Sequence, residues 1–118
     1  MSKKSTVSIT VSLETAHELV KKFMADSKIF AALNINVKGE PRLWSINPKA
    51  GRGFIVGGQT AQTTNPNHVK VFDMRAAQPR GEKGRFAPVN ANGWRTLNTA
   101  TLVSIKKGNT TYWIDRTI

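Results

Sequence analysis

The stretch GWRTLNTATLVSI, residues 93–105, constrains the fold more than any other part of this chain. Residues 94–97 and 102–106 each have the composition of a short β-strand, and a small polar segment, Asn98, Thr99 and Ala100, lies between them. So short a connection leaves room for one tight turn of the 3₁₀ type. We therefore expect two strands that run on nearly in line but belong to opposite sheets.

The N-terminal part of the chain predicts a strand followed by a helix. Residues 7–11 alternate apolar and polar side chains, as a strand with one apolar face does. Ser12 is a preferred helix N-cap, and Glu14 suits the positive end of the helix dipole. A helix is predicted over 13–24, ending near 25–26, from an apolar stripe made of Leu13, Ala16, Leu19, Val20, Phe23 and Met24. Ser27 suggests a further short helical turn over 29–32.

The rest of the chain has the patterns of short strands. Alternation over 33–46 around the turn KGEP predicts a hairpin, with Gly39 suited to positive φ. Residues 68–74 predict another strand, and its period allows either Val69 and Val71 or Phe72 and Met74 to face inward. A Lys-Gly-Asn corner at 107–109 predicts a last hairpin, whose second strand covers 110–115. Long loops are expected over 47–67 and 75–92.

These elements predict one mainly β domain over 1–118. Its expected parts are an N-terminal strand and helix (1–28) and a small barrel of five to six short strands (29–118), because a closed barrel leaves no exposed strand edge. The expected barrel core is Leu33, Ile35, Val37, Trp44, Ile46, Val71, Trp94, Leu102, Val103 and Ile105. We also expect Trp113 to be a packing residue.

Three spaced motifs between residues 30 and 106 resemble a known family. They are SINP at 45–48, HVKVFDM at 68–74 and GWRTLNTATLVSI at 93–105. In this order they resemble the small bacteriophage proteins described as Sm-like SH3 β-barrels, which are related to the WYL domain. The resemblance implies an SH3-like barrel, a bacteriophage origin and a cytoplasmic location in the bacterial host. The loop over 74–92 is longer and more basic than the family pattern, and the N-terminal strand and helix are additions.

Several classes of function have no support in the sequence. The chain has no cysteine, which excludes disulfides and zinc–thiolate sites, and no apolar run long enough to span a membrane. Its two histidines, His17 and His68, lack neighbours at metal-ligand spacing. The segment GRGFIVGG at 51–58 lacks the Gly-Lys-Ser/Thr of a phosphate-binding loop. We therefore expect no enzymatic activity, no metal and no cofactor.

Charge is the strongest indication of a partner. The chain has 18 lysines and arginines against seven acidic residues, a net charge of +11 and an isoelectric point near 10.6. Such an excess is typical of nucleic-acid-binding domains. An acidic bacterial protein, bound by a host-takeover adaptor or inhibitor, is the alternative partner. The sequence does not distinguish DNA from RNA or single from double strands, and it leaves the oligomeric state undecided.

Two arginine–glycine segments are the expected contact sites. GRGF at 51–54 and PRGEKGRFAP at 79–88 combine arginines for phosphate, glycines for close approach and phenylalanines that can stack on bases. Phe54 and Phe86 could instead anchor the loops to the barrel. The predicted function is binding of nucleic acid through backbone phosphates with weak sequence preference. The candidate residues are Lys49, Arg52, Arg75, Arg80, Lys83, Arg85, Phe86 and Arg95.

The loop prediction is tested by replacing Arg80, Lys83 and Arg85 together with Ala. The melting temperature should barely change, because no predicted strand is altered. The log–log salt slope of binding should fall by about 2.7 on duplex DNA, or about 2 on single strands, if each side chain meets one phosphate. Phe86→Ala should weaken single-strand binding by about 1–3 kcal/mol if the ring stacks on a base. An unchanged slope in a titration by anisotropy would exclude this loop as the contact site.

Overall fold

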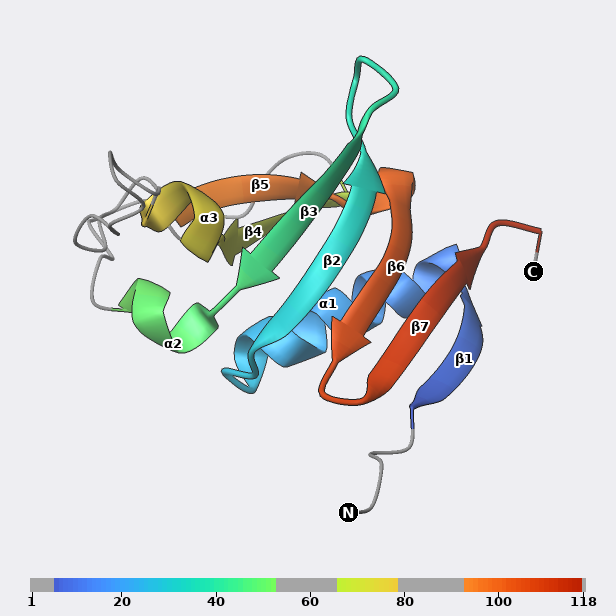
Figure 1. Cartoon of the computed structure of the whole chain (residues 1–118), viewed down its shortest axis with the longest axis horizontal. Coiled ribbons are helices and arrows are strands. Elements are labelled where there is room, and N and C mark those ends of the chain that lie inside the picture. The colour runs from blue at the N-terminus through green and yellow to red at the C-terminus, as the bar shows by residue number, and fades with distance from the viewer. Residues whose placement is uncertain (1–5, 53–65, 79–92, 118) are drawn as a thin grey trace.

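The fold is mainly β and consists of two sheets and one long helix. A computed structural model describes residues 6–52, 66–78 and 93–117. The five-stranded sheet has the order β1 (Val7–Ser12), β7 (Thr110–Asp115), β6 (Leu102–Lys107), β2 (Phe30–Ile35) and β3 (Pro41–Ile46). The second sheet contains β4 (His68–Phe72) and β5 (Trp94–Asn98). Helix α1 (Leu13–Ala25) covers one face of the larger sheet (Figure 1). None of the described helices is long and apolar enough to cross a membrane.

The two sheets are linked where the end of β3 meets the residue after β4, but the described strands do not close into a barrel. β1 pairs with β7 in parallel, whereas the other strand pairs are antiparallel. An isolated bridge joins Ile46, at the end of β3, to Asp73, directly after β4. The Asn47 amide also donates to the Phe72 carbonyl, at 3.0 Å. The prediction of a mainly β domain is confirmed, while β1 is left as an edge strand.

The turn predicted between the last two strands of the motif is present. Helix η4 (Thr99–Thr101) is a 3₁₀ turn that joins β5 to β6, and these strands belong to different sheets. Asn98 begins the turn, because its side-chain oxygen accepts a hydrogen bond from the Ala100 amide at 3.0 Å. The Lys-Gly-Asn corner also forms the predicted hairpin, between β6 and β7, with Gly108 at φ 61°. Local residue chemistry determines both connections.

Helix α1 follows its predicted pattern. The Ser12 side chain accepts a hydrogen bond from the Thr15 amide and caps the helix, which buries Ala16, Val20 and Phe23 against the sheet. The further helical turn predicted over 29–32 is wrong. Residues 30–32 belong to β2, a central strand that pairs with β3 on one side and β6 on the other. Pairing on both sides outweighs a weak capping signal at Ser27.

The predicted inward face of β2 is also wrong. Ile35 and Val37 are 37% and 104% exposed, and Leu33 is only half-buried. The buried side chains of β2 are Phe30, Ala32 and Asn34. Asn34 is polar yet fully paired: Trp44 Nε1 donates to its Oδ1 at 2.9 Å, and its Nδ2 donates to Thr101 Oγ1 at 3.1 Å. The predicted core residues Trp44, Ile46, Val71, Leu102 and Ile105 are buried as expected, and Val103 is half-buried.

The last two residues of β4 are buried on opposite faces of the strand, which explains why the sequence pattern did not indicate a single inward face. Val71 joins the main core with Leu97, while Phe72 on the opposite face packs between two glycines. A Cβ added at Gly51 would lie 2.7 Å from Phe72, and one at Gly93 would lie 2.5 Å from the Ala77 Cβ. We call Gly51, Phe72, Ala77, Gly93 and Trp94 the Phe72 cluster.

Two predicted packing residues occupy other places. Trp94 is half-buried and meets Phe72 edge-on, with ring centroids 5.3 Å apart, so it belongs to the Phe72 cluster and not to the main core. Trp113 is 46% exposed, because it lies on the face of the five-stranded sheet opposite to α1. Within the predicted loops, the structure contains two short helices, α2 (Pro48–Gly51) and α3 (Met74–Ala77).

The buried Asn34–Trp44 hydrogen bond yields a stability prediction. Asn34→Ala should lower the free energy of unfolding by about 1–3 kcal/mol, because it leaves the Trp44 indole N–H buried without an acceptor. The double variant Asn34→Ala/Trp44→Phe should recover part of this loss, because the orphaned donor is then gone. Urea denaturation of the four proteins measures the coupling. Strict additivity of the two substitutions would show that this bond contributes nothing.

Candidate nucleic-acid interface

The structure describes four of the eight predicted contact residues. Lys49 lies in α2, Arg52 follows it, Arg75 lies in α3 and Arg95 lies in β5, and all four are exposed. The other four predicted contacts, Arg80, Lys83, Arg85 and Phe86, lie outside the described residues.

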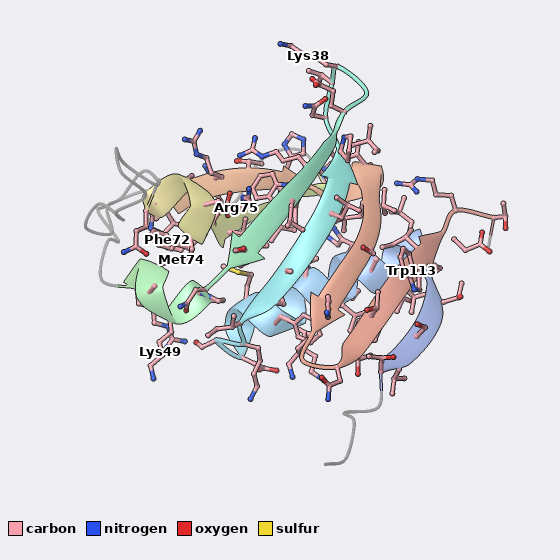
Figure 2. All side chains as sticks on the ribbon, viewed as in Figure 1. Lys38, Lys49, Phe72, Met74, Arg75 and Trp113 are labelled. Atoms are coloured by element: carbon pink, nitrogen blue, oxygen red, sulfur yellow. The ribbon has the colours of Figure 1, made fainter. Side chains whose placement is uncertain are left out.

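The Phe72 cluster brings α2 and α3 to one end of the molecule. Each helix contributes one residue to this cluster. Gly51 of α2 packs against Phe72, and Ala77 of α3 packs against Gly93. Lys49, Arg52 and Arg75 are thus held at the same end, which we call the basic end. Figure 2 shows Lys49 and Arg75 there, on either side of Phe72 and Met74. Residues more than twenty positions apart in sequence therefore share one surface.

Asp73 holds α3 in place. Its carboxylate is 1% exposed, and Oδ1 accepts hydrogen bonds from the amides of Ser45 and Arg75, both at 3.1 Å. Its own amide donates to the Gly93 carbonyl at 2.7 Å. The bond from Ser45 fixes this residue to β3, and the bond from Arg75 caps α3, which begins at Met74. The position of the Arg75 backbone is therefore set by a buried carboxylate.

Helix α2 is built in a similar way. Asn47 caps it by accepting a hydrogen bond from the Ala50 amide at 3.1 Å, and Pro48 occupies the first turn, where no amide hydrogen is needed. The Asn47 amide is itself bonded to the end of β4. Lys49 is thus carried on a single turn of helix that is attached to the second sheet.

Arg42 has a structural role beside Asp73. Its guanidinium lies 4.4 Å from the centre of the Trp44 ring, and Nη2 lies 3.8 Å from Asp73 Oδ2. It stacks on the indole and offsets the buried negative charge. The sequence did not indicate this contact, because Arg42 and Asp73 are distant along the chain.

Acidic and basic residues occupy different regions. Among the described residues from 41 to 114, Asp73 is the only acid, and it is buried. The exposed acids Glu14, Glu18 and Asp26 lie in and just after α1, and Glu40 lies in the β2–β3 turn. The basic residues of the same described region are Arg42, Lys49, Arg52, Lys70, Arg75, Arg95, Lys106 and Lys107. Within the described residues from 41 to 114, basic side chains thus outnumber acidic ones eight to one.

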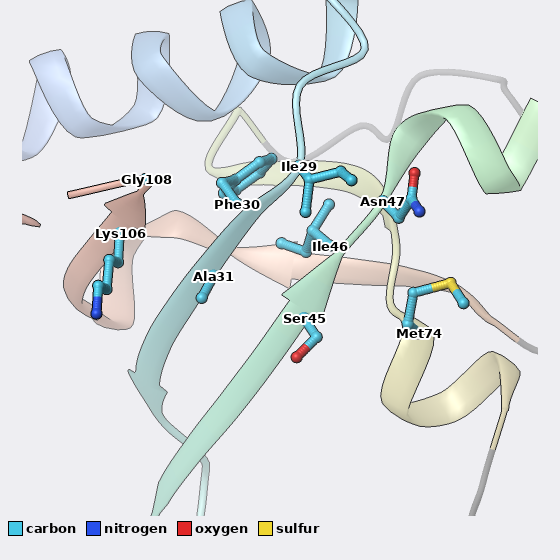
Figure 3. Close-up of a pocket in the computed structure, with 9 residues that line it drawn as sticks. All are labelled: Ile29, Phe30, Ala31, Ser45, Ile46, Asn47, Met74, Lys106 and Gly108. Atoms are coloured by element: carbon cyan, nitrogen blue, oxygen red, sulfur yellow. The ribbon is translucent and has the colours of Figure 1, made fainter. Parts of the chain in front are cut away.

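A shallow pocket of about 290 Å³ continues this surface from α3 across the sheet. Figure 3 shows Met74 of α3 and Lys106 of β6 on opposite sides of it, with Ala31 and Ser45 between them. The lining is mostly apolar, and Lys106 is its single charged side chain. Such a lining suits contact with an apolar group.

The histidines offer no alternative site. The Nδ1 atom of His17 lies 2.8 Å from Thr99 Oγ1, which fixes the α1 side chain to η4. Within the described residues, no three metal-ligating side chains come together.

No protein-family model, no curated protein and no solved structure matches this chain. The resemblance to phage barrel proteins therefore rests only on the residue motifs quoted above.

Asp73 generates a second stability prediction. Asp73→Ala should lower the free energy of unfolding by about 3–5 kcal/mol, because Arg42 and two amides lose their buried partner. Asp73→Asn should cost less, since both amides bond to the same oxygen, which the amide side chain keeps, and only the charge facing Arg42 is lost. Urea denaturation measures both. Asp26→Ala is the control, because removing that exposed carboxylate should change stability by less than about 0.5 kcal/mol. Equal effects at positions 73 and 26 would contradict a role for Asp73 as the junction.

Proposed function

We propose that this chain binds nucleic acid, mainly through backbone phosphates and with weak sequence preference. The observation that carries the proposal is the separation of charge: among the described residues from 41 to 114, every exposed charged side chain is basic, because their one acid, Asp73, is buried. A surface of one sign lets a polyanion approach without local repulsion, and it binds by release of counterions.

The scaffold of the basic end favours this role. Lys49 and Arg75 are carried on capped helical turns that pack around Phe72, so their backbones are positioned before any ligand arrives. Pre-positioned side chains lose less conformational freedom on binding than side chains of an unstructured tail. The predicted contacts Arg80, Lys83 and Arg85 follow α3 in sequence and lie outside the described residues.

We further propose that strands β2 to β6 are a partly open form of an SH3-like barrel. In support, β2 pairs with both β3 and β6, the Ile46–Asp73 bridge connects β3 to β4, and η4 connects β5 to β6. A bacteriophage origin and a bacterial cytoplasmic location go with this proposal. We propose a binding function and no catalysis.

The test compares two triple variants that remove the same charge. Lys49→Ala/Arg52→Ala/Arg75→Ala removes three cations from the basic end. Lys21→Ala/Lys22→Ala/Lys28→Ala removes three exposed cations from the acid-bearing region of α1. The first variant should lower the log–log salt slope on duplex DNA by about 2.7, or about 2 on single strands, whereas the second should change it little. Fluorescence anisotropy from about 50 mM salt upward, on duplex DNA, single-stranded DNA and RNA, gives the slopes and the preferred form.

Two results would contradict the proposal. No binding by the unaltered protein at the lowest salt would exclude nucleic acid as the ligand. Equal losses in both triple variants would mean that net charge, and not the basic end, controls binding. Stoichiometric recovery of one acidic protein from nuclease-treated lysate, together with absent nucleic-acid binding, would favour the adaptor or inhibitor function instead.

A further inference from the structure

Strand β1 is an unprotected edge. It is the outermost strand of the five-stranded sheet, with β7 on one side and no other described strand on the other (Figure 1). Natural edge strands are usually blocked by charged residues, proline or a bulge. Residues 6–12, TVSITVS, contain no charge, proline or glycine, and β1 follows β7 in unbroken register. This edge therefore has the properties of a strand that pairs with another strand.

The direction of the backbone groups in β1 determines how a partner can pair. The Val7 amide donates to the Asn109 carbonyl at 2.8 Å, so the backbone groups of Val7 point toward β7. Because these groups alternate sides along a strand, those of Ile9 and Val11 also point toward β7. The amides and carbonyls of Ser8 and Thr10 then point to the free edge. Any added strand must bond to these two residues.

The side chains of β1 are nearly symmetrical about Ile9. Read in either direction from Ile9, the strand has a small hydroxyl residue (Ser8 or Thr10) followed by valine (Val7 or Val11). Val7 and Ile9 are 47% and 40% exposed although they lie on the apolar side of the strand. A partner strand that covers them needs apolar side chains on the same face, and a second copy of β1 has them in the matching positions.

We propose that two copies of this chain associate through β1, antiparallel and with the two-fold axis at Ile9. Ser8 of each copy then pairs with Thr10 of the other, and these residues exchange four backbone hydrogen bonds. Ile9 meets its own copy in a non-hydrogen-bonded pair, where Cα atoms are about 4.5 Å apart. Val7 meets Val11, so β-branched side chains form one continuous row, a pairing that stabilises sheets. A shift by one residue is excluded, because residues whose backbone groups point to the free edge would then lie opposite residues whose backbone groups point to β7.

The rest of the chain permits this association despite its net charge of +11. No charged residue occurs between Thr6 and Leu13, so no like charges face one another across the axis. The basic end lies beyond β3, the strand at the opposite edge of the sheet. The two basic ends of the pair are therefore far from the contact, and their repulsion is screened at physiological salt.

A disulfide test probes the register directly, because the chain has no cysteine of its own. Ile9→Cys places one thiol of each copy at the two-fold axis, at a Cα separation suited to a disulfide. Under mild oxidation it should form covalent dimers at least roughly tenfold faster than Val37→Cys, whose thiol can meet another only by random collision. Val37 is the matched control because it is fully exposed in the β2–β3 turn. Equal rates for the two variants would overturn the proposal.

A proline pair tests the backbone argument in solution. Thr10→Pro removes an amide that points to the free edge, so the folded monomer should keep its melting temperature while the dimer is lost. Ile9→Pro removes an amide bonded to β7 and should lower the melting temperature. Sedimentation velocity over a concentration series, on nuclease-treated protein, measures the mass. If the unaltered chain remains a monomer at about 100 µM, the dissociation constant of any dimer lies above that concentration, and the proposal is overturned. Nucleic-acid binding is measured separately and can succeed or fail independently.

Discussion

The buried carboxylate of Asp73 is the interaction on which the arrangement of the two sheets depends. It connects three elements, because Asp73 directly follows β4, and its carboxylate accepts hydrogen bonds from the Ser45 amide of β3 and from the Arg75 amide in the first turn of α3. A lone carboxylate in this position would be strongly unfavourable. The Arg42 guanidinium, stacked on Trp44, and the two amides offset that cost. The junction thus adds polar contacts to an apolar core that both sheets share, since Val71 and Leu97 of the smaller sheet pack into it.

Packing around Phe72 complements this junction. The ring is fully buried between Gly51 and Gly93, neither of which can carry a side chain without displacing it. Close contact at these glycines brings α2 and α3 together, and so places Lys49 and Arg75 on one surface. The basic end therefore exists because a small apolar cluster holds two short helices that would not be stable alone.

Features that depend on adjacent residues were predictable from the sequence. The Ser12 cap, the 3₁₀ turn after Asn98 and the Gly108 corner all follow from local chemistry. Features that depend on distant partners were not. Asn34 is buried because Trp44 and Thr101 satisfy it, so the pattern of β2 suggested the wrong face. The basic residues of the candidate site could be named from the sequence alone. Their common location could not, because it depends on the contacts by which Asp73 and Phe72 hold α2 and α3.

The parallel pairing of β1 with β7 has a consequence for synthesis of the chain. Val7 lies beside Thr110, so the two strands come from nearly opposite ends of the sequence. On a ribosome β1 and α1 emerge before β7, so the five-stranded sheet stays incomplete until β7 has followed. Contacts between such distant residues also slow folding. A nascent chain therefore exposes both backbone edges of β1 while the residues between β1 and β7 are made, and in that interval neighbouring chains on the same messenger can pair with it.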